Sequence, residues 1–139
     1  MRVSNAAVIH LSHLGLTVRD ERRSQRFYPA YFGFDAATAQ EYEDGTVIIR
    51  NADGFDLALH PVEHIEQQPA FLHAGFKAAR PADVRMLMGR MEADSFTIVE
   101  RDDEAAYVAF KCLDPDGHRM EVYWEPPFPG NAQAASSPR

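Results

Sequence analysis

Apolar and polar residues alternate in two short stretches of the chain that resemble one another. "LSHLGLTV" occupies residues 11–18 and "FLHAGFKA" occupies residues 71–78, and each places a histidine two residues before a glycine. Alternation with a period of two is typical of a β-strand that has one buried face. The two stretches therefore predict two equivalent strands, each with an apolar face and a face that carries a histidine.

The elements after each of these strands are predicted to follow the same order. Residues 19–32 combine charges with aromatic residues on one helical face, with Asp20 as the N-cap and Gly33 as the helix end. The turn sequences "EDG" and "NADG" then separate three short strands. The second half repeats this order, with a helix that begins near Pro81 and a final hairpin closed by "DPDG". The chain thus predicts two βαβββ modules.

The two modules define the expected fold class and domain organisation. We expect an α+β fold in which paired βαβββ modules form a curved mixed sheet with the helices on its outer face. The linker "EHIEQQP" is too short to separate independent domains. The charged run "ERDDEAA" is interpreted as a solvated loop. The expected boundaries are residues 1–62 for the first module, 63–69 for the linker, 70–126 for the second module and 127–139 for a mobile C-terminal tail.

Strand parity predicts which side chains share a face. Because alternate residues of a strand point to the same side, His13 and His73 face away from the apolar side of their strands. In the last strand, Glu121 likewise opposes Met120 and Val122. Helices that cover the apolar sides would leave a concave face on which the two histidines and the glutamate converge. The residues expected in the core are Leu16, Phe76, Val122 and Trp124.

Two imidazoles and a carboxylate form a ligand set for a divalent transition-metal ion. His13, His73 and Glu121 could hold Fe(II), Mn(II), Zn(II) or Ni(II) and leave coordination positions open for water or substrate. A carboxylate in the otherwise apolar run "MEVYW" would be costly to bury without a partner, and a metal ion removes that cost. The alternative is an exposed face on which Glu121 is solvated.

Composition and charge argue against several other classes of protein. The chain has 139 residues, a formal net charge of -7 and a sequence pI near 5.3. An acidic chain without a basic face does not fit nucleic-acid binding. No apolar run approaches the roughly 20 residues of a membrane span, and "MRVSNAAVIH" lacks the features of a signal peptide, so we expect no membrane partner and a cytoplasmic location. The single Cys112 has no partner for an internal disulfide and is expected to face the core.

Three motifs resemble those of a known superfamily. "HLGLTVRD", "HAGFKA" and "DPDGHRMEVYWE" are similar to motifs of the vicinal oxygen chelate superfamily, which includes glyoxalase I, extradiol dioxygenases, fosfomycin-resistance proteins and bleomycin-binding proteins. The resemblance extends over roughly residues 8–126 and implies metal ligands at His13, His73 and Glu121. Where glyoxalases of the superfamily have a fourth, acidic ligand, this chain has Ala58, so the resemblance favours the members with three ligands.

The resemblance implies a divalent-metal-dependent enzyme that binds a small-molecule substrate through vicinal oxygens, most similar to an extradiol dioxygenase. Two alternatives stay open: a fosfomycin-type transferase or lyase, and a metal-free protein that binds a drug or a metabolite. Catechol-cleaving members usually have a tyrosine where this chain has Lys111. Relatives of this length usually dimerise, so we expect a homodimer. The side chains that could contact substrate are Thr17, Arg50, His60, Lys77, Lys111, Arg119 and Tyr123.

Overall fold

The computed structural model describes residues 8–127 of the chain. The mobile tail expected over residues 127–139 therefore lies, except for its first residue, outside the described residues. The chain divides into two compact units between Ile65 and Glu66. Each unit has its own sheet and its own helix.

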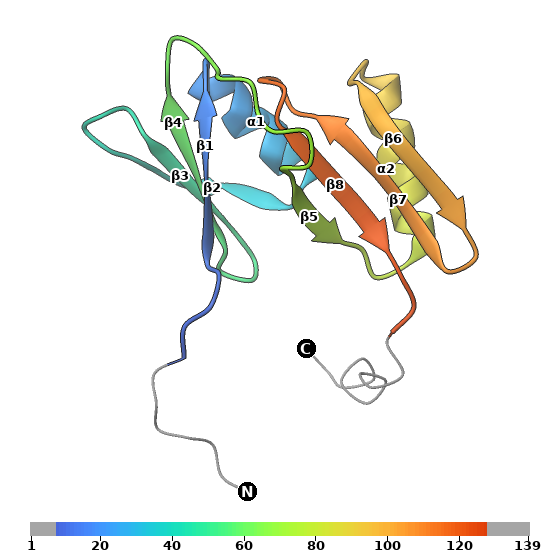
Figure 1. Ribbon diagram of the computed structural model, residues 1–139. Helices are drawn as coiled ribbons and strands as arrows, with labels where there is room; N and C mark the ends of the chain where they lie inside the picture. The colour runs from blue at the N-terminus through green and yellow to red at the C-terminus, as the bar shows by residue number, and fades with distance from the viewer. Residues whose placement is uncertain (1–7, 128–139) are drawn as a thin grey trace, which may run out of the picture. The chain divides into compact units, whose positions relative to one another are not determined.

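The first unit contains β1 (His13–Val18), α1 (Glu21–Tyr31), β2 (Phe34–Glu41), β3 (Val47–Asn51) and β4 (Asp56–Pro61). Its four strands form a mixed sheet in the order β1-β4-β3-β2 (Figure 1). β1 runs parallel to β4, whereas β3 is antiparallel to both β4 and β2. β1 is therefore an edge strand, and α1 connects it to β2 at the opposite edge of the sheet.

The helix α1 begins and ends where the sequence predicts. The Asp20 carboxylate accepts hydrogen bonds from the backbone amides of Arg22 and Arg23 at 3.1 and 3.2 Å, which satisfies two amides at the helix start. After the last turn, Gly33 adopts a positive φ of 76°, a conformation that favours glycine. The aromatic face of the helix is buried, with Phe27 4% exposed and Tyr28 fully buried.

The second unit repeats the first. It contains β5 (Ala74–Lys77), α2 (Pro81–Ala93), β6 (Ile98–Glu104), β7 (Tyr107–Leu113) and β8 (Arg119–Trp124). The strand order is β5-β8-β7-β6, with β5 parallel to β8 and the other pairs antiparallel. The predicted α+β class and the βαβββ order are confirmed, and within residues 8–127 the strands lie in two four-stranded sheets, one in each unit.

The charged run at residues 100–106 is not the loop that the sequence analysis expected. Its first five residues continue β6, which pairs with β7 as far as Glu104 opposite Tyr107. Ion pairs between Arg85 and Asp103 and between Arg101 and Glu92 also connect the strand to α2. The strand lies at a sheet edge with both sides of this run exposed, so it shows no apolar alternation, and charged edge strands resist pairing with other chains.

Each helix covers the apolar face of its own sheet. α1 packs on β2 and β4, and α2 packs on β7 and β8. Of the four predicted core residues, Val122 is 4% exposed and Leu16, Phe76 and Trp124 are partly buried. Along β8 the buried residues Met120 and Val122 alternate with the partly exposed Glu121 and Tyr123. The predicted strand parity is therefore correct.

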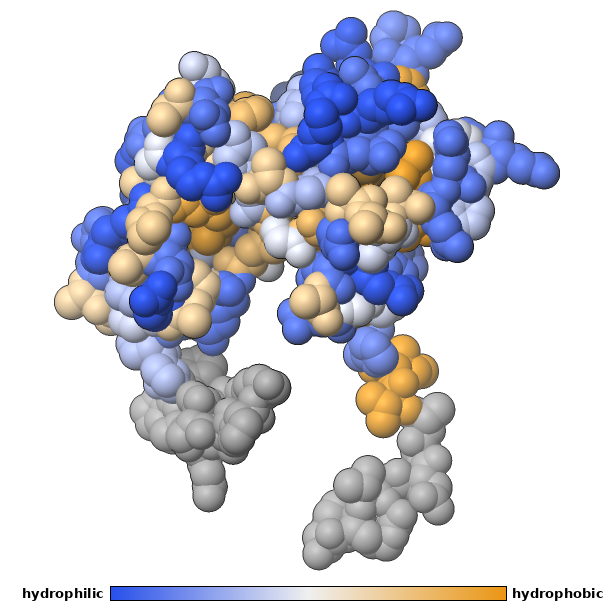
Figure 2. All heavy atoms as spheres, turned by 180° about the vertical axis from the view of Figure 1, so that it is seen from behind, coloured by the Kyte–Doolittle hydropathy of each residue, from blue (hydrophilic) through white to orange (hydrophobic). Residues whose placement is uncertain are grey.

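Apolar side chains are also exposed where the chain enters the first unit (Figure 2). Val8 and Ile9 are 80% and 94% exposed, and Leu11 is 85% exposed. Phe71 and Leu72, which hold the equivalent place before β5, are 87% and 56% exposed. No helix in residues 8–127 is long and apolar enough to cross a membrane.

Candidate metal centre

The second unit brings two of the predicted metal ligands together. Gly75 of β5 lies opposite Glu121 of β8 in the parallel ladder, and His73 lies just before β5. The Nε2 atom of His73 is 3.5 Å from Oε1 of Glu121. Both side chains are partly exposed, with 29% of the His73 side chain and 18% of the Glu121 side chain accessible to solvent.

The imidazole of His73 is oriented by the backbone. Its Nδ1 atom lies 2.9 Å from the carbonyl oxygen of Phe71. Because a carbonyl only accepts hydrogen bonds, Nδ1 must carry the proton, and in the neutral ring Nε2 then presents its lone pair to Glu121. A histidine that donates one ring N–H to a backbone carbonyl and directs the other nitrogen at an acidic group is arranged as metal-binding histidines usually are.

The second carboxylate oxygen of Glu121 has a different partner. The hydroxyl of Tyr107 donates a hydrogen bond of 3.1 Å to Oε2. Burial, followed by this hydrogen bond, raises the pKa of Tyr107 to about 12, so the phenol is a donor at neutral pH. Sequence reasoning missed Tyr107. The signal was its parity, because Tyr107 and Lys111 lie on the same face of β7 and Lys111 is directly opposite Glu121.

Gly75 keeps space open beside this pair. A Cβ atom at this position would lie 3.7 Å from Oε1 of Glu121 and 3.4 Å from the Tyr123 ring. A methyl group would touch both side chains, and any larger side chain would extend among them. Lys77 follows on the same face, opposite Tyr123, and its side chain is exposed.

The third predicted ligand lies in the first unit, in the equivalent strand. His13 begins β1 and is exposed, and it lies opposite Asp56 of β4. In the same ladder Gly15 pairs with Ala58, as Gly75 pairs with Glu121. The registers confirm that Ala58 is the counterpart of Glu121. The first unit therefore has the histidine of the pair and lacks its carboxylate.

Polar side chains surround a hollow on the same face of the first sheet. Asp56 is the cross-strand partner of both His13 and Arg50, so these three side chains point to the same side. The hollow has a volume of about 340 Å³. Its lining residues are Thr38, Gln40, Tyr42, Ile48, Arg50 and Asp56.

His60 and Thr17 lie further along this face. They are partners in the β1–β4 ladder, and the Nδ1 atom of His60 is 2.9 Å from the hydroxyl of Thr46. The His60 ring covers Gly15, where an added Cβ atom would be 3.3 Å from Nε2. A glycine at this position lets the imidazole lie close against the strand.

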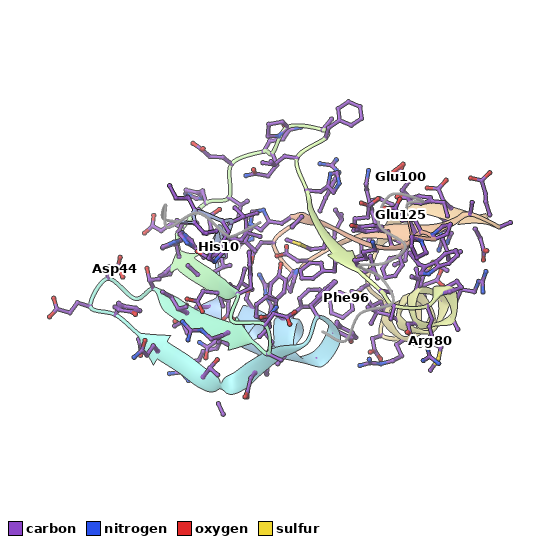
Figure 3. The ribbon with its side chains drawn as sticks, turned by 90° about the horizontal axis from the view of Figure 1, so that it is seen from below. His10, Asp44, Arg80, Phe96, Glu100 and Glu125 are labelled. Atoms are coloured by element: carbon purple, nitrogen blue, oxygen red, sulfur yellow. The ribbon has the colours of Figure 1, made fainter. Side chains whose placement is uncertain are left out.

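Two of the basic residues expected to contact an anionic substrate are held by acidic neighbours. Arg50 donates two hydrogen bonds to Asp56, at 2.7 and 3.1 Å. The Nζ atom of Lys111 is 2.8 Å from Glu100, which is labelled in Figure 3. By contrast, no carboxylate of the described residues lies within 4 Å of Lys77 or Arg119. Of the four basic residues expected to contact an anionic substrate through a cationic group, the two without a carboxylate neighbour, Lys77 and Arg119, both lie in the second unit.

Within residues 8–127, no three histidine, cysteine, aspartate or glutamate side chains gather into a group that could hold a metal ion. The His73–Glu121 pair belongs to the second unit and His13 to the first. Cys112 is fully buried, which confirms that it faces the core, and its burial raises the pKa of the thiol to about 12.

Several solved structures resemble the chain. A possible glyoxalase from Bacillus cereus is 28% identical, with a TM-score of 0.70 over 83% of this chain and 98% of that protein. The fosfomycin resistance protein FosX from Listeria monocytogenes is 15% identical, with a TM-score of 0.72 over 86% and 96%. A FosX structure in complex with Mn(II) and a sulfate ion is 16% identical, with a TM-score of 0.71 over 86% and 93%.

Sequence comparison identifies the family. No curated protein matches the chain. Residues 10–122, which include both βαβββ units and all three predicted metal ligands, match the Glyoxalase/Bleomycin resistance protein/Dioxygenase superfamily. The chain therefore belongs to this superfamily.

Proposed function

We propose that the protein is a divalent-metal-dependent enzyme that binds a small substrate through adjacent oxygen atoms, with His13, His73 and Glu121 as its metal ligands. The observation that carries this proposal is the 3.5 Å separation between His73 Nε2 and Glu121 Oε1. Two atoms that are each about 2.1 Å from one ion and about 90–110° apart lie about 3.0–3.4 Å from each other. The pair is therefore spaced almost as two ligands of one ion would be.

A hydrogen bond between His73 and Glu121 explains the 3.5 Å separation less well than a metal ion between them does. A hydrogen bond between an imidazolium and a carboxylate would bring the two atoms to about 2.7–2.9 Å. With Nδ1 occupied by the carbonyl of Phe71, a neutral His73 turns a lone pair toward a carboxylate oxygen. Two electron-rich atoms that face each other at this distance favour a positive ion between them.

A bound ion of this kind would supply a Lewis acid that lowers the pKa of a substrate hydroxyl and stabilises the negative charge that develops on oxygen. The residues of the chain provide the space for the substrate and leave coordination positions open. Gly75 leaves space for the substrate beside Glu121. The position that would supply a fourth protein ligand is Ala58, which leaves room for two substrate oxygens.

The charge distribution favours an uncharged diol, and hence an extradiol dioxygenase-like reaction. Arg50 is neutralised by Asp56 and Lys111 by Glu100, so neither is available to a phosphonate or a carboxylate without breaking an ion pair. A fosfomycin-type transferase or lyase would have to bind its anionic substrate through Lys77 and Arg119. Oxygen consumption with a panel of catechols and Fe(II), compared with turnover of an epoxide phosphonate and Mn(II), separates the two reactions.

Metal binding distinguishes the enzyme from a metal-free binding protein. Calorimetric titration of the protein with Mn(II), Zn(II) or Fe(II) should show about one ion per chain, and His73→Ala should weaken binding at least about 100-fold because it removes a direct ligand. His64→Ala is the matched control, since His64 is exposed outside both sheets and should leave binding unchanged. Absence of binding by the unmodified protein at near-millimolar metal would contradict the proposed function.

A further inference from the structure

The two oxygens of Glu121 have different partners. Oε1 faces Nε2 of His73, whereas Oε2 accepts the hydrogen bond of Tyr107. Lys111, which is opposite Glu121 in the β7–β8 ladder, is 2.8 Å from Glu100 and is therefore engaged elsewhere. Among the described residues, Tyr107 is thus the donor that distinguishes one carboxylate oxygen from the other.

The position of Tyr107 is well defined. It begins β7 and pairs with Glu104 next to the turn of the β6–β7 hairpin, so its backbone is held by the ladder. Its side chain is partly buried and has few rotatable bonds, so the hydroxyl needs little ordering to reach Glu121. The Tyr107 hydroxyl is therefore already in contact with Oε2 in the absence of a ligand.

We propose that Tyr107 is a positioning residue that makes Glu121 a one-oxygen ligand: by holding Oε2 it leaves only Oε1 to bind the metal ion. This inference rests on the proposed function. A carboxylate that binds through both oxygens occupies two coordination positions, and a six-coordinate ion with two histidines would then keep two open positions in place of three. Tyr107 would therefore preserve the position that a co-substrate needs beside a substrate bound through two oxygens.

The variant Tyr107→Phe tests the proposal because it retains the ring and removes only the hydroxyl. The probe is Mn(II) alone, and the readouts are the infrared carboxylate bands of 13C-glutamate-labelled protein and the number of Mn(II)-bound waters from proton relaxation. We expect the antisymmetric and symmetric bands of Glu121 to lie far apart in the unmodified protein and to approach each other in Tyr107→Phe. The variant should also lose one bound water, while Mn(II) affinity changes less than about 10-fold.

Tyr42→Phe is the matched control, because the Tyr42 hydroxyl donates to Gln40 in the first unit and should leave the bands and the waters unchanged. Identical bands and waters in Tyr107→Phe and the unmodified protein would overturn the positioning role while leaving metal binding intact. If Tyr107→Phe did not fold, the unmodified protein alone would still test the proposal. Closely spaced carboxylate bands, which indicate that Glu121 binds Mn(II) through both oxygens, would overturn the positioning role. Failure of the unmodified protein to bind Mn(II) would overturn the proposed function, and this inference with it.

Discussion

Neighbouring residues of β8 lie in opposite environments. Met120 is 1% exposed on the helix-covered face, and Glu121, the next residue, faces His73 and Tyr107 on the other face. This difference follows from the pleat of the strand, since successive side chains point to opposite sides of the sheet. The same strand thus contributes to the core of the second unit and to its candidate metal centre.

Met120→Ala tests the core side of this arrangement. Because Met120 is almost completely buried, the substitution should leave a cavity and lower the free energy of unfolding by about 2–5 kcal/mol. Met86→Ala is the control, since Met86 is 67% exposed on α2 and its loss should change stability by no more than about 0.5 kcal/mol. Urea denaturation measures both, and equal effects of the two substitutions would show that β8 does not bury Met120.

The two helices differ in how they begin. The Asp20 side chain caps α1, but α2 has Arg80 at its N-cap and no side-chain hydrogen bond to its first amides. Pro81 at the start of α2 removes one of the amides that would need a partner. Arg80 is instead paired with Asp83 of the first turn, at 2.6 Å. The start of α1 is therefore stabilised by a single polar side chain, Asp20, whereas the start of α2 has no side-chain cap.

Asp20→Ala should lower the free energy of unfolding by about 1 kcal/mol, because the amides of Arg22 and Arg23 lose their acceptor. Asp20→Asn retains a carbonyl oxygen and should be close to the unmodified protein, which separates capping from charge. Thermal unfolding followed by circular dichroism measures both variants. If alanine and asparagine had the same effect, the hydrogen bonds from Asp20 would not stabilise α1.

Ion pairs and hydrogen bonds lower the pKa of several surface carboxyls across the molecule. A hydrogen bond from Arg50 lowers the pKa of Asp56, and hydrogen bonds from Arg85 and Lys111 lower those of Asp103 and Glu100. The unfolded values are near 3.8 for aspartate and 4.5 for glutamate, so the folded state holds its protons less tightly than the unfolded state. The resulting stabilisation is present above these values and is lost as the pH falls through the lower folded values.

The melting temperature should therefore be nearly constant from about pH 7 to about pH 5 and fall below about pH 4. Removing one partner with Arg85→Gln should reduce the acid-induced decrease, because the pKa of Asp103 then returns toward its unfolded value. Scanning calorimetry from neutral to acidic pH measures this dependence at low ionic strength, where surface charges are least screened. A decrease centred near pH 6 would implicate histidine titration and contradict this explanation.

The oligomeric state of the protein affects the candidate metal centre, because a second chain could supply one of its ligands. β1 and β5 are edge strands, and the apolar residues that precede them are exposed, including Ile9 and Phe71 at 94% and 87%. Unpaired edges beside exposed apolar residues favour association with a second chain, so we expect a homodimer. Light scattering should give twice the 15.6 kDa mass of the chain, and a single species of 15.6 kDa at micromolar concentration would contradict the dimer.

Mixed dimers reveal whether one metal site draws ligands from two chains. His13→Ala and Glu121→Ala chains should each lose metal binding when pure. If the ligands cross the interface, each dimer that contains one chain of each variant has one site with all three ligands intact and one site that lacks two of them. One of the two sites in such a dimer should therefore bind metal. Titration with Mn(II) after refolding the variants together measures this recovery. No recovery would mean that each site takes all its ligands from one chain.

Local patterns were sufficient to predict many features of this protein. The period of two in residues 13–18 and 119–124 predicts which side chains are buried, because the pleat acts on neighbouring residues. The cap at Asp20 and the glycine at position 33 predict the ends of α1, because a helix terminus is satisfied by groups a few residues away. The repeat of the whole pattern predicts that His13 and His73 occupy equivalent strands.

Long-range register decided the rest. The charged residues 100–104 form a strand only because β7 supplies their hydrogen bonds, and no pattern within the run records that partner. The ladders likewise place Arg50 beside Asp56, and the contact of Tyr107 with Glu121 spans 14 positions of the sequence. The strength of an electrostatic contact depends on distances of a few ångströms, which strand pairing sets and residue order alone does not. The sequence by itself therefore determined the order of helices and strands, the buried faces of β1 and β8 and the candidate ligands. Only the tertiary structure decided how far β6 extends, which charges are neutralised and which donor orients the carboxylate.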